Sequence, residues 1–341
     1  CLSGMLRSMR RRGPDARGIK ITENAILFHT RLIVVDPENG AQPMTCRENG
    51  LEYTIVYNGE LYNTEELRSE LSAEGVFFFG RSDTEVVLKS YIRWGEKCLS
   101  RFNGIFAFAI WENTERTLFF ARDRMGVKPF FYALKNDTFL FASEIKTILE
   151  YPDVEPVVDR EGIVDLLFIG PGRTPGCAVF RDIHELKPGC FGTYGKDGLQ
   201  ISSYWNLKDR VHTETPEETV EHVRYLVTDA IRRQLISDVP LGTFLSGGLD
   251  SSIISAVAAE EYRNRGQQLD TFSVTYTDNM KYFRTSRFQP STDEPYIRQM
   301  VRFLGSNHHT FVVDNEQLAY ALKTAVDARD LPGMADIDSS L

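Results

Sequence analysis

The feature that most constrains this chain is a glycine turn between a short apolar segment and a long helical one. The segment Pro240–Ser252 reads PLGTFLSGGLDSS. Its apolar residues predict a strand that ends at Leu245, and Ser251–Arg265 has the spacing of a helix. A strand that passes through Ser-Gly-Gly into a helix suits an anion, because glycines let the backbone approach closely and the helix start offers unpaired N–H groups.

The residues around this turn alternate between helix and strand signals. A long amphipathic helix is predicted at Glu217–Leu235, before the turn. The elements predicted after it are strand Leu269–Tyr276, helix Tyr296–Leu304, strand Thr310–Val313 and helix Glu316–Arg329. Such alternation is typical of βαβ units, so residues 209–341 are expected to form an α/β domain with a mostly parallel sheet.

The first part of the chain has a different pattern, in which strand signals dominate. The expected strands are Ala25–His29, Leu32–Val35, Tyr53–Tyr57, Ile105–Trp111 and Thr117–Ala121. Helical spacing is found at Thr64–Glu74 and Asp83–Trp94. Residues 1–208 are therefore expected to form a layered α+β domain, with the domain boundary in the polar segment Tyr204–Pro216.

The composition excludes several classes of protein. The formal net charge is −9 and no long basic run is present, which disfavours a nucleic-acid binder. No apolar stretch has the length of a membrane span, and no signal peptide is recognisable. The five cysteines have neither paired metal spacing nor a dense disulfide pattern. We therefore expect a reducing, cytoplasmic compartment and neither a membrane nor a nucleic acid as partner.

The glycine turn resembles the PP-loop of ATP pyrophosphatases, which cleave ATP between the α and β phosphates and adenylate a substrate. The resemblance implies an ATP site at Leu245, Ser246, Gly247, Gly248, Leu249, Asp250, Ser251 and Ser252, with Val274 holding the adenine. The carboxylate of Asp250 is of the kind that binds Mg²⁺ on phosphates. Without the resemblance, Val274 is equally well an ordinary core residue of a strand.

Five motifs of the first part resemble the class II glutamine amidotransferases, which have an N-terminal nucleophile. They are Arg12–Asp15, His29–Leu32, Tyr57–Asn63, Ser82–Glu85 and Arg122–Pro129. With the PP-loop they follow the order found in glutamine-dependent asparagine synthetases. The resemblance implies an N-terminal-nucleophile layered sandwich followed by a PP-loop domain. We expect Arg122–Pro129 to be a charged turn without a catalytic role.

The same resemblance assigns roles to residues of the first domain. Cys1 is the expected nucleophile, and its α-amino group, with an ordinary pKa of about 7.7–8.0, is the local base. Asn58 and Gly59 would form the oxyanion hole. The expected glutamine-binding residues are Arg31, Leu32, Val34, Val35, Asn58, Gly59, Glu60 and Asp83. Arg31 would bind the α-carboxylate and Asp83 the α-ammonium group. From the residues alone, Asn58-Gly59 is a hairpin-turn signal and Arg31 and Asp83 are surface charges.

Both ends of the chain depart from the family pattern. The family begins Cys-Gly-Ile and continues through a strand, whereas here Cys1 is followed by Leu2-Ser3-Gly4 and soon by Arg12. Either residues are absent after Cys1 or Cys1 is not the nucleophile; we favour the first. After Leu341 the family continues with further acid-rich and lysine-bearing segments, so we expect a partial view of a longer protein.

Two segments near the end carry further expectations. Leu331–Ser340 resembles the acceptor-site segment of asparagine synthetases, although from the residues alone its carboxylates suit a helix start. His308 and His309 are adjacent on an expected strand, so their side chains should point to opposite faces and not share a metal.

The resulting expectation is an ATP-dependent amide ligase. It would use glutamine, aspartate and ATP with Mg²⁺ to make asparagine, AMP and pyrophosphate, and it could assemble as a homodimer. Two alternatives stay open: a related ligase that forms another amide or lactam, and a non-catalytic regulatory protein that binds nucleotide or glutamine.

Overall fold

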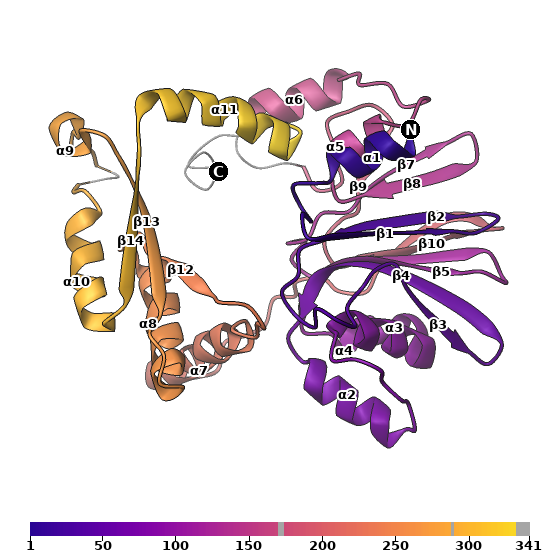
Figure 1. The fold of residues 1–341 in the computed structure, drawn as a ribbon, viewed down its shortest axis with the longest axis horizontal. Helices are drawn as coiled ribbons and strands as arrows, with labels where there is room; N and C mark the ends of the chain where they lie inside the picture. The colour runs from indigo at the N-terminus through magenta and orange to yellow at the C-terminus, as the bar shows by residue number, and fades with distance from the viewer. Residues whose placement is uncertain (170–173, 288–289, 332–341) are drawn as a thin grey trace. The chain divides into compact units, whose positions relative to one another are not determined.

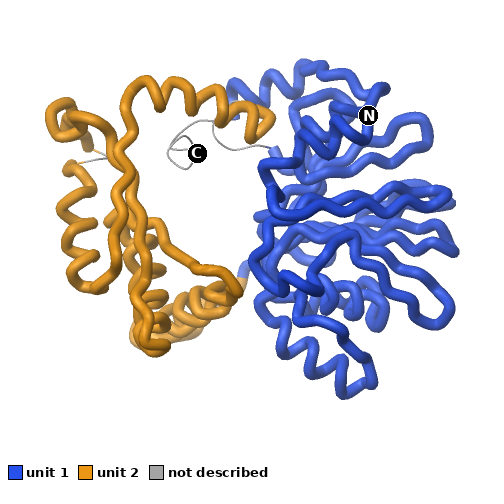
Figure 2. The backbone as a smooth tube through the Cα atoms, in the orientation of Figure 1, with its two compact units in different colours: residues 1–209 blue, residues 210–341 orange. Residues whose placement is uncertain are grey.

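The structure is a computed structural model, and it describes residues 1–169, 174–287 and 290–331. The chain divides into two compact units, residues 1–209 and 210–341 (Figure 2).

The first unit is built on a six-stranded antiparallel sheet with the order β11-β10-β6-β5-β4-β3. Four of its strands, β3, β4, β5 and β10, are labelled in Figure 1. Its strands are β3 (Met44–Glu48), β4 (Leu51–Leu61), β5 (Gly104–Glu112), β6 (Thr117–Arg122), β10 (Cys190–Gly195) and β11 (Gly198–Ser203). Residues 106–112 of β5 are all buried, so this central strand is covered on both faces.

Two smaller sheets complete the strands of this unit. One is the hairpin of β1 (Ala16–Ile21) and β2 (Ile26–Arg31), and the other has the order β8-β7-β9. The strands of the second are β7 (Phe131–Lys135), β8 (Thr138–Ala142) and β9 (Ile183–Glu185). The helices of the unit are α1 (Leu2–Ser8), α2 (Thr64–Ala73), α3 (Asp83–Trp94), a 3₁₀ turn η1 (Gly95–Lys97), α4 (Cys98–Arg101), α5 (Ile145–Leu149) and α6 (Arg160–Phe168).

The six-stranded sheet has a hydrophobic core on each face. On one face Val86, Val87 and Leu88 of α3 pack with Phe106 and Phe108 of β5. On the other face the core is formed by side chains of several elements, including Ala107, Ala109, Phe120, Phe130 and Leu186. Successive residues of β5 thus serve opposite cores, as the two-residue period of a strand requires. The layered α+β domain predicted from the sequence is confirmed.

The prediction of a strand at Leu32–Val35 is wrong. Strand β2 ends at Arg31, and the following residues form an irregular loop. The Val35 carbonyl at the end of this segment accepts a hydrogen bond from the Arg31 guanidinium, as do the carbonyls of Asp36 and Pro37 that follow it. Leu32 is 59% exposed, so apolar character alone did not indicate a buried strand here.

The second unit contains a three-stranded parallel sheet with the order β12-β13-β14. The strands are β12 (Gly242–Phe244), β13 (Asp270–Tyr276) and β14 (Asn307–Val313). The helices are α7 (Pro216–Arg233), α8 (Leu249–Asn264), α9 (Asn279–Tyr282), α10 (Glu294–Leu304) and α11 (Asn315–Arg329). A small core that includes Leu245, Ala258, Leu269 and Leu304 joins helices to this sheet. The predicted parallel α/β arrangement is confirmed.

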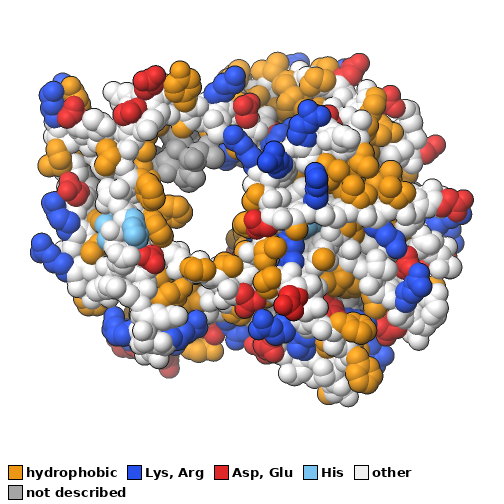
Figure 3. Space-filling view, viewed as in Figure 1, with side chains coloured by type: hydrophobic (Ala, Val, Ile, Leu, Met, Phe, Trp, Pro, Cys, Tyr) orange, Lys and Arg blue, Asp and Glu red, His pale blue; other side chains and the backbone are white. Residues whose placement is uncertain are grey.

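Two surface properties bear on the expected partners. Figure 3 shows that Lys and Arg side chains and Asp and Glu side chains are both spread over the visible face of each unit. None of the helices in the described ranges combines the length and apolar character needed to cross a bilayer. That no nucleic acid binds stays a prediction.

Candidate functional site

Strand β4 carries three of the expected glutamine-site residues, Asn58, Gly59 and Glu60. Asn58 pairs with Ala107 and Gly59 with Phe106, inside the ladder with β5. The alternative that Asn58-Gly59 is a hairpin turn is therefore wrong. The Asn58 side chain lies at the limit of hydrogen-bond distance from Ser143, with 3.5 Å between Nδ2 and Oγ.

Gly59 lies where a larger residue does not fit. A Cβ atom at this position would collide with the Ile105 carbonyl oxygen and lie 2.8 Å from the Phe106 Cα atom. Both obstacles are backbone atoms, which cannot rotate away. The glycine therefore sets the close approach of β4 to β5.

Past the end of β3, one edge of β4 carries the Gly59 N–H between two N–H groups that already donate hydrogen bonds to side chains. Backbone N–H groups alternate in direction along a strand, so those of Tyr57, Gly59 and Leu61 point the same way. The Tyr57 N–H donates to Gln42 Oε1 at 2.6 Å, and the Leu61 N–H donates to Asp83 Oδ2 at 3.2 Å. Among the described residues, no side chain accepts a hydrogen bond from the Gly59 N–H, which makes it a candidate donor to a ligand.

Two residues to which the sequence interpretation gave no role hold Tyr57, the residue before Asn58. Gln42 Nε2 donates to the Tyr57 carbonyl at 3.1 Å, in addition to accepting from its N–H. His29 Nε2 lies 3.1 Å from the same carbonyl. Burial lowers the pKa of His29 to about 4, with a further lowering by the nearby Arg31 charge, so the ring is neutral near pH 7 and Nε2 is the protonated nitrogen.

Asp83 begins helix α3 and points its carboxylate toward β4. Its Oδ2 accepts from the Tyr57 hydroxyl at 3.0 Å as well as from the Leu61 N–H, and its Oδ1 accepts from the Thr84 N–H at 2.8 Å. Burial raises the pKa of Asp83 above its ordinary value, although these hydrogen bonds oppose the shift. The group is thus not a surface charge but a carboxylate fixed beside Asn58–Glu60.

Arg31 is also not a surface charge, since only 9% of it is exposed. Its Nη2 donates to the carbonyls of Val35 and Asp36 at 2.8 Å, and its Nη1 donates to that of Pro37 at 3.3 Å. These described carbonyls take three of the five guanidinium N–H groups, leaving Nε and one Nη1 donor for a carboxylate. Of the other expected residues, Val34 and Val35 are partly buried in the loop and Leu32 is exposed.

Cys1 lies at the start of helix α1 and is exposed. Its carbonyl accepts from the Gly4 and Met5 N–H groups, and its thiol lies 3.9 Å from the Met5 sulfur. Helix α1 packs on α5, where the Ser8 and Thr147 hydroxyls are 2.8 Å apart. Within the described part of the chain, no hydrogen bond joins Cys1 to Asn58, Gly59 or Asp83, so the structure does not itself assemble the nucleophile with the rest of the expected site.

The motif Arg122–Pro129 forms a turn held from within. The Asp123 carboxylate accepts from the N–H groups of Phe106, Met125, Val127 and Lys128 at 3.0–3.2 Å. The buried Arg122 guanidinium donates to three carbonyls, including Lys128 at 2.7 Å. These bonds support β5 opposite Gly59, in keeping with the expected shaping role.

The glycine turn of the second unit lies between β12 and α8, as predicted. Leu245 is buried and its N–H donates to the Phe272 carbonyl at 2.7 Å, which fixes the entry to the turn. Gly247 has φ of +79°, and Gly248 caps α8. The positive φ and the lack of space both require glycine, since a Cβ atom on Gly247 would lie 2.8 Å from the Tyr296 Cβ.

Hydroxyl groups join the glycine turn to the N-terminal end of helix α8. Ser246 and Ser251 place their Oγ atoms 3.0 Å apart, and the Gly248 N–H donates to Ser246 Oγ at 3.3 Å. Asp250 lies in the first turn of α8 and is exposed, and Ser252 follows Ser251 on the helix. The side chains of the turn offer oxygen atoms as metal ligands, which suits Mg²⁺ when phosphate oxygens and waters complete its coordination. Val274 is partly buried on the neighbouring strand β13.

His308 and His309 point to opposite faces of β14, as predicted. His308 lies 3.0 Å from the hydroxyls of both Thr271 and Ser273, whereas His309 stacks on Phe272 and lies 2.8 Å from Asp270. Among the described residues, no group of three or more His, Cys, Asp or Glu side chains could hold a metal ion.

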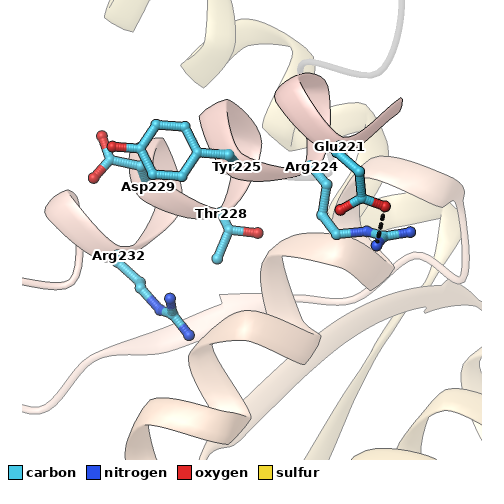
Figure 4. Close-up of a pocket in the computed structure, with 6 residues that line it drawn as sticks. All are labelled: Glu221, Arg224, Tyr225, Thr228, Asp229 and Arg232. Carbon is cyan, nitrogen blue, oxygen red and sulfur yellow. Dashed lines mark hydrogen bonds and ion pairs between the residues drawn. The ribbon is translucent and has the colours of Figure 1, made fainter. Parts of the chain in front are cut away.

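A hollow on helix α7 lies outside every expected site. Its volume is about 260 Å³ and it is lined by Glu221, Arg224, Tyr225, Thr228, Asp229 and Arg232 (Figure 4). The Arg224 and Glu221 side chains form an ion pair at 2.8 Å. All its lining residues come from one helix, so it has no opposing wall to enclose a ligand. The acceptor-site expectation at Leu331–Ser340 lies outside the described residues from position 332 onward.

Known proteins resemble the chain in both units. Residues 1–205 match the glutamine amidotransferase domain family, and residues 222–341 match the asparagine synthase family. The chain is 50% identical to glutamine-hydrolysing asparagine synthetase 3 of Bacillus subtilis over 338 residues, which cover 99% of this chain and 55% of that protein. It is 32% identical to a putative glutamine-hydrolysing asparagine synthetase of Methanocaldococcus jannaschii, covering 91% of this chain and 61% of that protein.

A relative with a different name is the amidase chyE of Penicillium rubens. It is 33% identical over 329 residues, which cover 94% of this chain and 48% of that protein. The chain thus spans about half to three-fifths of the length of these relatives. Its amidotransferase match covers more than half of the chain and is followed directly by an asparagine synthase match. The chain therefore belongs to the family of glutamine-hydrolysing asparagine synthetases, in which a glutamine amidotransferase domain precedes an asparagine synthase domain.

Proposed function

We propose that the protein containing this chain makes asparagine from aspartate, with ATP as the energy source and glutamine as the source of ammonia. One observation carries the proposal: a single chain holds the Gly59 N–H and Asp83 beside one strand edge and the Ser246–Ser252 loop between β12 and α8. The first arrangement suits an amide with an ammonium group, and the second suits a polyphosphate.

In the first reaction the Cys1 thiol attacks the side-chain amide carbon of glutamine, and the α-amino group of Cys1 takes the thiol proton. Charge on the amide oxygen is stabilised by the Asn58 side chain and the Gly59 N–H. Ammonia leaves with that proton, and water hydrolyses the thioester to glutamate. Arg31 holds the α-carboxylate and Asp83, with Glu60, the α-ammonium group; Leu32, Val34 and Val35 line the same pocket.

In the second reaction the side-chain carboxylate of aspartate attacks the α phosphorus of ATP, and pyrophosphate leaves. Leu245–Ser252 hold the phosphates through the turn N–H groups and hydroxyls, and Val274 contacts the adenine. Mg²⁺ would be bound by Asp250 and would neutralise phosphate charge. Ammonia then attacks the β-aspartyl-AMP carbonyl, which releases AMP and gives asparagine. A cytoplasmic location and a homodimer also remain predictions.

A second candidate is a ligase that forms another amide, because the similar proteins include one of Penicillium rubens that is named for amide chemistry and not for asparagine synthesis. A panel of carboxylic acids tested for pyrophosphate release separates the two candidates. Release with aspartate above all other acids supports asparagine synthesis.

The decisive experiment compares the full-length wild type with Cys1→Ala and Asp250→Asn. Cys1→Ala should abolish glutamate release and keep ammonia-dependent asparagine formation. Asp250→Asn should abolish asparagine formation from either nitrogen source and keep glutamate release. Asp278→Asn is a matched control, because Asp278 is an exposed carboxylate of the same unit with φ of +58°, which asparagine tolerates. Release of neither glutamate nor pyrophosphate by the wild type would refute the proposal and favour a regulatory binding protein.

A further inference from the structure

The two residues proposed for the two charged ends of glutamine are joined by a third residue. Arg31 Nη2 donates to the main-chain carbonyl of Asp36 at 2.8 Å. The Asp36 carboxylate in turn accepts from the N–H groups of Arg81 and Ser82 at 2.6 and 3.1 Å, through Oδ2. Asp83 is the next residue. Asp36 thus contacts Arg31 with its backbone and the segment before Asp83 with its side chain.

Asp36 is buried and is held in this position by several hydrogen bonds. It is 4% exposed, and its Oδ1 accepts from the Asn39 N–H at 3.0 Å. Its φ is +48°, a conformation that asparagine and aspartate adopt more readily than most residues. A buried carboxylate with several N–H donors is held firmly, because each bond involves a charged acceptor.

Two glycines make room for these contacts. A Cβ atom on Gly80 would lie 2.6 Å from Asp36 Oδ2, so the carboxylate can reach Arg81 and Ser82 only past a residue without a side chain. A Cβ atom on Gly40 would collide with the Arg31 guanidinium. The chain therefore leaves space on both sides of Asp36, toward Arg31 and toward Asp83.

The bonds of Asp36 also set the start of helix α3. Ser82 is the N-cap of α3, and its hydroxyl accepts from the Thr84 N–H at 3.1 Å. Fixing the Ser82 N–H fixes the first turn of the helix, and with it the direction of the Asp83 carboxylate toward Tyr57 and Leu61. A shift of Asp36 would thus move Arg31 and Asp83 relative to each other.

We propose that Asp36 is a positioning residue that sets the separation of Arg31 and Asp83, and thereby selects a substrate with both an α-carboxylate and an α-ammonium group. The proposal rests on the proposed function of these two residues as the glutamine-binding pair. Asp36 itself has no contact with substrate in this scheme and acts through Arg31 and Asp83.

The test uses the full-length protein with Asp36→Asn, Gly80→Ala and the control Glu112→Gln. Glu112 is a comparably buried carboxylate, 7% exposed, that accepts from the Thr114 and Glu115 N–H groups. Glu112 lies six residues along β5 from Phe106, which is the partner of Gly59. The distance between Glu112 and Phe106 along the strand is therefore about 20 Å. Glu112→Gln removes a buried charge from the same unit without touching the glutamine pocket.

Two substrates are compared, glutamine and glutaramate, which has the same amide and terminal carboxylate but no α-amino group. Asp36→Asn and Gly80→Ala should raise the KM for glutamine about tenfold and leave its kcat and the ammonia-dependent reaction near the wild-type values. The KM for glutaramate should change less, because glutaramate does not use Asp83. Glu112→Gln should leave both KM values unchanged.

Equal changes for glutamine and glutaramate, or a glutamine KM no different from that of Glu112→Gln, would overturn the assignment. Amide hydrogen exchange gives a readout that needs no activity: exchange at Arg81 and Ser82 should accelerate in Asp36→Asn and not in Glu112→Gln. Unchanged exchange would also overturn it. A wild type that releases no glutamate refutes the proposed function instead, and the exchange result still decides whether Asp36 holds this segment.

Discussion

The side-chain amide of Gln42 pairs with both backbone groups of Tyr57. Tyr57 N–H donates to Oε1 at 2.6 Å, and Nε2 donates to the Tyr57 carbonyl at 3.1 Å. Strand β3 begins only at Met44, which pairs with Ile55, so the Gln42 side chain continues the ladder one step beyond the strand. Next to Asn58–Glu60, the side of β4 that faces away from β5 is therefore held by a side chain and not by a strand.

Replacing Gln42 by Glu should impair the glutaminase reaction. Glutamate keeps an acceptor for the Tyr57 N–H but places a second oxygen against the Tyr57 carbonyl, which repels β4 locally. We expect kcat for glutamine hydrolysis to fall about 100-fold through misplacement of Asn58 and Gly59. Steady-state assays of glutamate release measure the effect, and ammonia-dependent synthesis is the internal control. An unchanged kcat would show that the pairing is dispensable.

Tyr57→Phe should shift the pH dependence of glutamine use. The Tyr57 hydroxyl lowers the pKa of Asp83, opposing the larger raising effect of burial. Without this hydroxyl the pKa of Asp83 rises further, so the carboxylate becomes protonated at higher pH and loses its attraction for the ammonium group. The acidic limb of kcat/KM for glutamine should move to higher pH, whereas the profile for glutaramate should stay in place. Identical profiles for wild type and variant contradict this prediction.

Gly59→Ala should remove glutaminase activity and destabilise the first unit. The added Cβ atom meets backbone atoms of Ile105 and Phe106, so β4 has to move away from β5. We expect the free energy of unfolding to fall by about 1–3 kcal/mol, as for other overpacked positions. Gly195→Ala, on the same sheet, is the control because its Cβ atom would have no neighbour nearer than 3.2 Å. Denaturant unfolding and glutamate release measure the two effects.

The stability of the first unit should depend on His29 at acidic pH. Its folded pKa of about 4 lies below the ordinary value of 6.5, so the unfolded chain binds the proton more tightly. The stabilisation is complete above pH 6.5 and is lost as the pH falls from 6.5 toward 4. At pH 4 the free energy of unfolding is lower by about 3 kcal/mol than above pH 6.5. His29→Gln lacks this titration, so the difference in unfolding free energy between wild type and variant should change with pH over this range. A constant difference would contradict the assignment.

In the second unit, Gly247→Ala should abolish ATP use. Alanine resists a φ of +79°, and its Cβ atom would lie 2.8 Å from the Tyr296 Cβ and 3.0 Å from the Ile297 nitrogen. The turn would reshape and its N–H groups would no longer converge on the phosphates. Pyrophosphate release should drop to background, while glutamate release continues. Gly266→Ala, with φ of +70° and open space around it, separates the cost of the backbone conformation from the collision.

Elements with a strong local pattern could be predicted from the sequence. Helix α3 has the predicted bounds Asp83–Trp94, because its apolar spacing is regular and Ser82 caps it. The turn between β12 and α8 was predicted from Ser246-Gly247-Gly248, since the glycines and the long helical segment that follows them leave few alternatives. Helix α1 and strands β7–β11 were not predicted individually, because short elements carry little periodicity.

The supports of the candidate site were beyond the reach of local patterns. Gln42 and Tyr57 are 15 residues apart, and Asp36 and Arg81 are 45 residues apart. Neither spacing matches the period of a helix or a strand. Both contacts form because the loop between β2 and β3 folds back and its side chains bind backbone groups far away in the sequence. The same reason explains the wrong strand prediction at Leu32–Val35, whose apolar residues line a loop that carries acceptors for Arg31.

The pairing of Tyr57 with Gln42 has a consequence for experiments in solution. Where β4 pairs with β3, from Leu51 to Ile55, that strand shields amide protons, but the Tyr57 amide proton is shielded by one side chain of a loop. Resonance lines from this proton would therefore report the order of the loop separately from that of the sheet. One nucleus on the backbone can thus signal when the pocket is assembled, without any label on the substrate.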